Sequence, residues 1–339
     1  MFSRLFHRRA TSMEKYLVIV VIAYIAIVGI KNPLFFSLET VFDTVRSGST
    51  MILFGLGLLV VLICGGIDVS FTAIAAAGGY LAVKILLASG IDNILLACAI
   101  AGLSGCLMGL VNAVLVHKYK LHALIVTLGT QSVFYGGMAL VLGTKSYSAA
   151  EMPKSMASFG SANIVSFAAD DGSSYGLTVF FPIAVVIGVL TWFILYRWRL
   201  GREIFAVGSD ADAASRIGIN VGLVRGFVYG YAGLLAGITG VIYFSNLRFV
   251  NPTGLVGSEL FVLAAVVIGG ATLTGGEGTI LGTILGVTVV QLFQNTLVFL
   301  GLSASFNNFF FGTVLLVTLA TMYLRKRRAN RENLVFGNA

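Results

Sequence analysis

The sequence has little charge and almost no proline. Charged residues make up 11% of the 339 residues, proline occurs 4 times, and hydrophobic residues reach 58%. Soluble domains are usually about a quarter charged and half apolar. A water-soluble core could not hide the excess apolar surface, so the composition excludes an ordinary soluble domain. It predicts an integral membrane protein.

Motifs for metal, thiol or nucleotide chemistry are also missing from the sequence. The three cysteines, Cys64, Cys98 and Cys106, lie in apolar runs without C-x-x-C spacing, so we expect buried thiols with neither metal nor disulfide. The sequence contains no H-E-x-x-H, no G-x-S-x-G and no phosphate-binding G-x-x-x-x-G-K-[ST] loop. We therefore expect no cofactor in this chain and no catalysis by the chain alone.

The excess of positive charge has two interpretations. The 22 Lys and Arg against 14 Asp and Glu give a net charge of +8, which could suggest a nucleic-acid partner. The basic residues, however, lie in short segments beside apolar runs, where they orient membrane helices. We favour a lipid membrane as the partner and expect no nucleic acid.

The apolar runs have the length of membrane helices, about 20 residues, and do not alternate as barrel strands do. They predict an all-α polytopic bundle of about ten transmembrane helices, some of them short or broken by glycine. The predicted spans are Lys15–Ile30, Ser49–Cys64, Phe71–Ala88, Ile94–Val116, Leu121–Leu142, Leu177–Trp198, Leu223–Phe244, Ser258–Ala271, Thr279–Leu300 and Ser305–Leu324.

The basic residues orient these spans. With an even number of spans, most Lys and Arg fall on one side together with both termini, which predicts that both termini are cytoplasmic. The chain is then a single transmembrane domain over residues 1–339. It has a cytoplasmic head (1–14), an external loop (143–176), a cytoplasmic loop (199–222) and a cytoplasmic tail (325–339). The basic start leads into an apolar run without a cleavage site, so the first segment is expected to remain as a span.

Glycine is abundant, and its spacing predicts where helices pack closely. Gly-x-x-x-Gly pairs occur at Gly105/Gly109, Gly226/Gly230 and Gly233/Gly237, and a ladder runs through Gly278, Gly282 and Gly286. Small residues at this spacing let helix backbones approach each other in lipid. The pattern is typical of a compact bundle and does not indicate a solute.

Two stretches combine paired glycines with polar residues inside apolar runs. They are VVLICGGIDVS at Val60–Ser70 and AAVVIGGATLTGGEGT at Ala264–Thr279. Irregular backbone at membrane depth survives only where protein or a water-filled cavity satisfies it, and transporters use such breaks near their path. We expect both breaks toward the cytoplasmic side. The residues that mark this predicted path are Gly65, Gly66, Asp68, Ser70, Gly269, Gly270, Thr272, Thr274, Gly275 and Gly276.

Three ionisable residues fall within predicted spans, where charges are rare and usually functional. Lys84 is near a helix end, from which its side chain can reach the membrane surface. Glu259 begins a span, a position that favours a carboxylate. Asp68 could cap the first-turn amides of the third span or line the path, and the sequence does not decide between these roles.

The cytoplasmic loop Arg199–Gly222 is long for a simple reversal of the chain. Ser209 or Asp210 could cap a short helix within it, ending at about Ile217. Either the loop reverses the chain, or it docks a cytosolic partner. The residues that mark the predicted docking surface are Arg202, Gly208, Asp210, Ala214, Arg216 and Gly218.

These motifs resemble those of the permeases of ribose-type ATP-binding-cassette importers. GGIDVS (Gly65–Ser70), RLGREIFAVGSDADAASRIGINV (Arg199–Val221) and ELFVLAAVVIGGATLTGGEGTILGT (Glu259–Thr283) match that family in order and spacing. The resemblance implies two permease chains around one path, cytosolic ATP-binding subunits that carry ATP and Mg²⁺ and dock on the Arg199–Val221 loop, and an external solute-binding protein. It also implies a bacterial inner-membrane location.

The chain departs from this family pattern at particular positions. Family members often carry an acid where this chain has Phe261, which puts a typical pentose or hexose in doubt and leaves a related diol, a furanone signal or a nucleoside open. The alternatives to a permease subunit are a self-sufficient secondary transporter or channel and a membrane-embedded enzyme. The first would need ionisable relays within the bundle, and the second a polar catalytic cluster.

Overall fold

The computed structural model describes residues 12–168 and 174–297, with scattered residues as far as 320. The head up to residue 11, the tail 325–339 and most of the tenth predicted span lie outside the described residues. The elements are α1 (Ser12–Lys31), η2 (Pro33–Phe36), α2 (Leu38–Ile63), α3 (Phe71–Ser89), α4 (Ile94–Lys118), α5 (Ala123–Leu142), α6 (Lys154–Ser161), β1 (Asn163–Ala168), β2 (Ser174–Thr178), α7 (Phe180–Tyr196), α8 (Arg199–Ser209), α9 (Ala211–Arg216), α10 (Val221–Leu247), α11 (Glu259–Ile268) and α12 (Ile280–Thr296).

The helices confirm a polytopic, all-α membrane bundle. Within the described part of the chain, six helices (α1 to α5 and α10) are long and apolar enough to cross a membrane. A seventh span results if α7 and α8, which bend by 72° at their junction, are taken together. Since α11 and α12 are shorter apolar helices, the count of ten spans stays a prediction.

Two features differ from the sequence expectation. The second span begins at Leu38 instead of Ser49, because the Ser37 hydroxyl caps the helix by accepting from the Thr40 amide at 3.2 Å and starts it well before the apolar run. The external loop 143–176 also contains α6 and the start of an antiparallel hairpin of β1 and β2. These short strands gave no apolar alternation from which to predict them.

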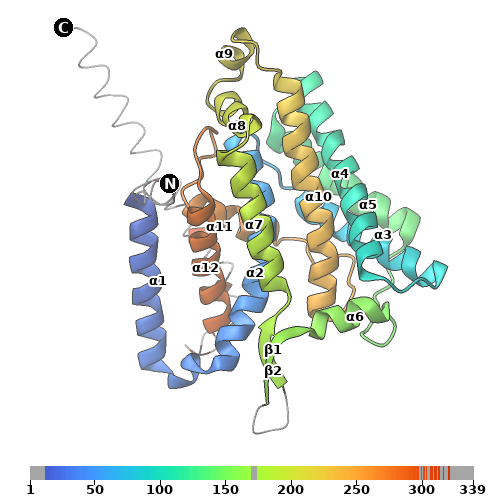
Figure 1. Ribbon diagram of the computed structural model, residues 1–339, viewed down its shortest axis with the longest axis vertical. Helices are drawn as coiled ribbons and strands as arrows, with labels where there is room; N and C mark the ends of the chain where they lie inside the picture. Colours follow the sequence, from blue (N-terminus) through green and yellow to red (C-terminus); the bar gives the residue numbers. More distant parts are fainter. Residues whose placement is uncertain are drawn as a thin grey trace.

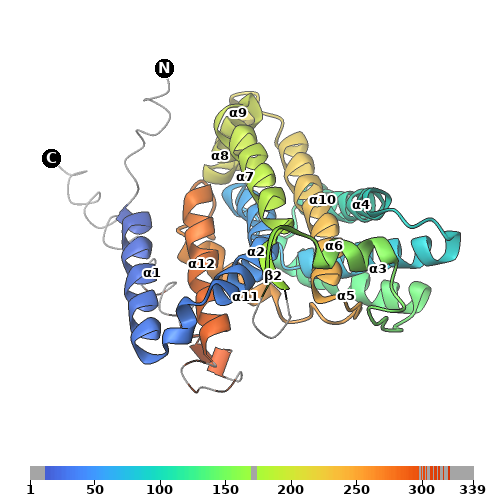
Figure 2. The ribbon, with the colours of Figure 1, turned by 60° about the horizontal axis from the view of Figure 1, so that its bottom comes forward.

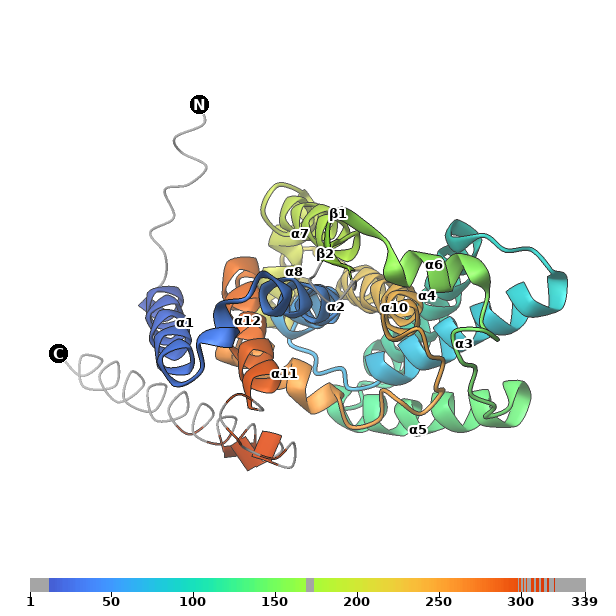
Figure 3. The same ribbon diagram turned by 90° about the horizontal axis from the view of Figure 1, so that it is seen from below.

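The bundle has two ends, which Figure 1 separates clearly. The docking-loop end carries α8 and α9, and the hairpin end carries α6, β1 and β2. Helices α2 and α10 lie at the centre, with α3, α4 and α5 on one flank and α12 on the other (Figure 3). Helix α1 lies at the edge beside α12 and is mostly exposed (Figure 2).

Glycines set the closest helix crossings, as the spacing predicts. A Cβ at Gly105 would collide with the Gly233 carbonyl, and one at Gly237 with the Ala101 carbonyl, where α4 crosses α10. Gly282 and Gly286 place α12 equally close to the α11 backbone. The prediction is wrong at Gly226, where an added Cβ would meet nothing within 4 Å.

Candidate functional site

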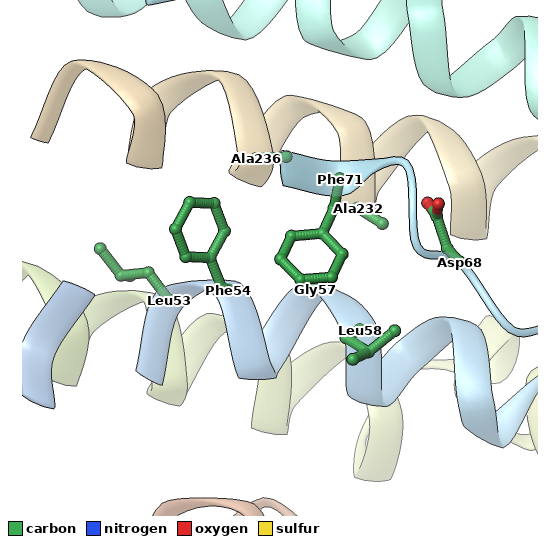
Figure 4. Close-up of a pocket in the computed structure, with 8 residues that line it drawn as sticks. All are labelled: Leu53, Phe54, Gly57, Leu58, Asp68, Phe71, Ala232 and Ala236. Carbon is green, nitrogen blue, oxygen red and sulfur yellow. The ribbon is translucent and has the colours of Figure 1, made fainter. Parts of the chain in front are cut away.

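The GGIDVS stretch forms a re-entrant break between α2 and α3. Helix α2 ends at Ile63, and Gly65 adopts the left-handed conformation (φ 82°) that reverses the chain. The following residues run back along α2, so that Phe71, the first residue of α3, packs on Phe54 with ring centroids 5.3 Å apart (Figure 4). Since Phe54 lies about two and a half helical turns before Ile63, α3 begins deep within the bundle and not at its end.

Another helix start lies beside that of α3, ahead of the second predicted break at Ala264–Thr279. Beyond α10 the chain continues without regular structure to Ser258, and α11 begins at Glu259. Glu259 Oε2 accepts from the Gly257 amide at 3.0 Å and from the hydroxyl of Thr72, in the first turn of α3, at 3.3 Å. The first turns of α3 and α11 therefore meet inside the bundle.

Asp68 is held in a buried chain of hydrogen bonds. Its side chain is 2% exposed, and Oδ1 accepts from the Ser70 amide at 2.8 Å and from the Ser70 hydroxyl at 2.7 Å. Asn112 on α4 donates to the same hydroxyl at 2.8 Å. Asp68 thus bonds the residue in front of α3 instead of the first-turn amides that one sequence hypothesis named. It also lines a cavity of about 10 Å³, next to Phe71 (Figure 4).

The two breaks and the predicted docking loop meet in what we call the glycine junction: Ile63, Gly65, Gly208, Gly275 and Gly276. The Gly276 amide donates to the Ile63 carbonyl at 2.9 Å. A Cβ on Gly275 would lie 2.5 Å from the Gly208 carbonyl oxygen and 2.6 Å from Gly65 Cα. These backbones touch without intervening side chains, so the end of α8 cannot move toward the two breaks without displacing them.

The other predicted path residues are less concentrated. Gly66 lies under the Tyr229 hydroxyl, Gly269 packs against the Gly282 carbonyl, and the Thr272 hydroxyl donates to the Gly275 carbonyl at 2.9 Å. Gly270 is left-handed, and Thr274 is exposed near the junction. Gly66 belongs to the first break, and the other four residues shape the turn between α11 and α12.

The predicted docking residues divide into buried and exposed groups. Gly208 and Ala214 are buried, whereas Arg202, Asp210, Arg216 and Gly218 are exposed at the docking-loop end. The prediction that a residue here caps a short helix is confirmed, because Asp210 Oδ1 accepts from the amides of Asp212 and Ala213 at 3.0 and 2.9 Å. Gly208 belongs to the junction beneath the surface and not to the surface itself.

A cavity in the hairpin half of the bundle was not predicted from the sequence; its lining is mainly apolar, with a few hydroxyl and amide side chains. It has a volume of about 220 Å³ and lies between α2, the end of α10, α11 and α12. Its lining includes Thr50, Asn246, Phe261 and Gln291. One signal was present: Gln291 and Gln294 are polar amides one helical turn apart inside the predicted ninth span. Phe261, at the departure from the family pattern, faces this cavity.

Metal-ligating side chains do not gather around these features. Within the part of the chain that the structure describes, no group of three or more His, Cys, Asp or Glu side chains could hold a metal ion. The three cysteines are free, with Cys64 buried in the core. The polar groups around the two breaks and the cavity are hydroxyls, amides and the carboxyls of Asp68 and Glu259, which can form hydrogen bonds to a solute or within the protein.

Comparisons with known proteins place these features in context. Residues 40–319 match the family model described as branched-chain amino acid transport system / permease component. The chain is 31% identical to the ribose import permease protein RbsC of Escherichia coli K12, over 93% of this chain and 95% of that protein. It is 31% identical to the D-allose transport system permease protein AlsC of the same organism, over 84% of each chain.

A third relative differs in its named solute. The autoinducer 2 import system permease protein LsrC of Yersinia pseudotuberculosis is 31% identical, over 88% of this chain and 81% of that protein. No solved structure matches this chain. The similarity to each relative covers both breaks and the docking loop, since it spans most of the chain.

Proposed function

We propose that this chain, which belongs to the family of branched-chain amino acid transport system permease components, forms the membrane path of a bacterial importer. The importer is driven by ATP and carries a sugar or sugar-like solute. The family gives the permease role. The solute class is inferred from relatives named for ribose, allose and autoinducer 2 import. The alternative is a self-sufficient secondary transporter or channel.

The glycine junction is the observation that carries the proposal. Arg202 and Arg216 lie on the exposed side of α8 and α9, and Gly208 at the end of α8 touches both broken segments. A force applied to the exposed side would therefore reach the path through backbone contacts without a flexible link. This is the connection that an importer driven by a separate ATPase requires.

The remaining parts of the assembly follow from this proposal. A cytosolic ATP-binding subunit, carrying ATP and Mg²⁺, docks on α8 and α9. A second permease chain, identical or related, completes the path, and an external solute-binding protein delivers solute at the hairpin end. The chain then lies in the bacterial inner membrane with both termini in the cytoplasm, consistent with the basic residues near the docking-loop end.

The test is a mild-detergent pull-down of the tagged chain from its native membrane, followed by mass spectrometry. We expect a P-loop ATPase to be recovered with the wild-type chain and lost with Arg202→Glu plus Arg216→Glu. Lys154→Glu is the matched control, because it reverses an exposed charge at the hairpin end. Recovery of the chain without an ATPase, together with solute transport in ATP-free vesicles, would establish the secondary transporter instead.

A further inference from the structure

We propose that the cavity between α2, α10, α11 and α12 is a binding site for one molecule of an uncharged, polyhydroxylated solute. We call it the solute chamber and define it by Thr50, Phe54, Tyr243, Asn246, Phe261 and Gln291. The proposal rests on the proposed function and adds to it the site at which the solute binds within the chain and the chemical class of solute that this site fits. None of these residues belongs to the path predicted from the sequence.

The shape and position of the chamber suit a small solute in transit. Its volume of about 220 Å³ is below the roughly 300–1,000 Å³ of sites for drug-sized ligands and several times the share of one water. A second cavity of about 420 Å³ adjoins it, and Ser47, Asn246 and Leu247 line both. The second cavity also involves Thr40 and Asp43, near the start of α2 at the hairpin end. The two cavities therefore form successive chambers leading inward.

The chamber contains buried polar atoms that have no partner within the protein. Thr50 is 5% exposed, and its Oγ1 makes no hydrogen bond; the buried Oδ1 of Asn246 has no partner either. A buried, unsatisfied polar atom costs about 1–3 kcal/mol, so native proteins rarely keep two in one place without a reason. Two hydroxyls of a ligand can donate one hydrogen bond to each of these atoms.

The chemistry of the lining selects the class of solute. Among the described residues that line the chamber, none is Asp, Glu, Lys, Arg or His. Amides and hydroxyls both donate and accept, as sugar hydroxyls require, and Phe54 and Phe261 offer apolar surface to ring C–H groups. A zwitterionic amino acid would leave two buried charges unpaired, which is far more costly than an unpaired hydroxyl.

An aromatic pair separates the chamber from the Asp68 region. Phe54 lines both the chamber and the small cavity beside Asp68, and its ring packs on Phe71. Figure 4 shows the two rings side by side, with Asp68 beyond Phe71. Both rings are almost fully buried. A solute that enters from the hairpin end therefore stops at this pair, which gives the chamber a floor.

The experiment measures binding to the purified full-length chain in lipid nanodiscs by equilibrium dialysis. The probes are radiolabelled D-ribose and D-allose as neutral sugars and L-leucine as a zwitterion. The variants are Thr50→Val and Gln291→Leu. Thr239→Val is the matched control, because this equally buried hydroxyl bonds only its own helix, at Leu235, and lies outside the chamber. Gel filtration confirms that each variant is folded.

We expect saturable binding of at least one neutral sugar and none of L-leucine. Thr50→Val and Gln291→Leu should each weaken it roughly two- to tenfold, the effect of one lost hydrogen bond, and Thr239→Val should not. Absence of neutral-sugar binding at millimolar concentration, binding of leucine, or variants equal to the control would overturn the assignment. The pull-down tests the proposed function independently. Recovery of an ATPase without sugar binding to the chamber would refute this inference alone. Sugar binding to the chamber without recovery of an ATPase would refute only the importer proposal.

Discussion

The glycine junction predicts that a single methyl group at Gly208 uncouples the docking loop from the path. An alanine Cβ there would collide with the Ile63 carbonyl and lie 2.8 Å from the Gly276 nitrogen. These two atoms are the partners of the 2.9 Å hydrogen bond that joins the breaks. Gly208→Ala therefore inserts its methyl group into that bond and forces α8 away.

The size of the effect follows from two contributions. Leaving the buried amide or carbonyl unsatisfied costs about 1–3 kcal/mol, and overpacking costs about 1–3 kcal/mol more. The two contributions sum to about 2–6 kcal/mol, and a cost of about 3 kcal/mol within that range would already lower the population of the native junction roughly a hundredfold relative to displaced arrangements. The exposed residues of α8 and α9 are unchanged, so a docked ATPase should still be recovered.

The assay is solute uptake per assembled transporter, with ATPase co-purification measured on the same membranes. We expect uptake to fall at least tenfold in Gly208→Ala while the ATPase is retained. Gly226→Ala on α10 is the control, because its Cβ would meet nothing within 4 Å and alanine favours a helix by about 1 kcal/mol. Wild-type uptake in Gly208→Ala would refute the coupling role of the junction.

Two further predictions concern Asp68 and the loop before α6. Asp68→Ala should lower the free energy of unfolding by about 2–4 kcal/mol, because the Ser70 amide and hydroxyl lose their acceptor. Asp68→Asn keeps an acceptor oxygen and should lower it less. Equal thermal stabilities of the two variants and the wild type in detergent would contradict the hydrogen-bond network. The amide and hydroxyl of Ser148, together with Lys145, lower the pKa of Glu151 below its ordinary 4.5. The contact between the Glu151 carboxylate and Ser148 is therefore fully present above pH 4.5 and is lost as pH falls through the lowered pKa. Glu151→Gln should speed hydrogen exchange of the Ser148 amide at neutral pH, after correction for intrinsic rates. It should also remove the dependence of Ser148 protection on pH.

The sequence predicted what depends on composition and glycine spacing. The apolar runs located α3, α4, α5 and α10 to within a few residues, because membrane helices need long apolar segments. Paired glycines located both breaks, because their backbone geometry excludes a side chain. Asp210 was recognisable as a helix cap for the same local reason.

Features that depend on long-range packing were not predictable in this way. The junction joins Gly65, Gly208 and Gly275, which are far apart in the chain, and no local pattern specifies their contact. The solute chamber uses Thr50 and Gln291, whose roles depend on how α2 faces α12. Helix α2 began earlier than expected because a cap at Ser37 outweighed the polar composition of its first turns.

The meeting of the first turns of α3 and α11 has an electrical consequence. Each helix N-terminus carries a partial charge of roughly +0.5, and Glu259, bonded to Thr72 across the two turns, supplies the opposite sign. The Glu259 carboxylate thus offsets the partial charges of these two helix starts, and a neutral solute that passes them moves no charge across the membrane. A membrane potential of 100 mV, which does about 2.3 kcal/mol of work on one elementary charge, then does none on this cargo. Accumulation against a gradient has to draw its energy from elsewhere.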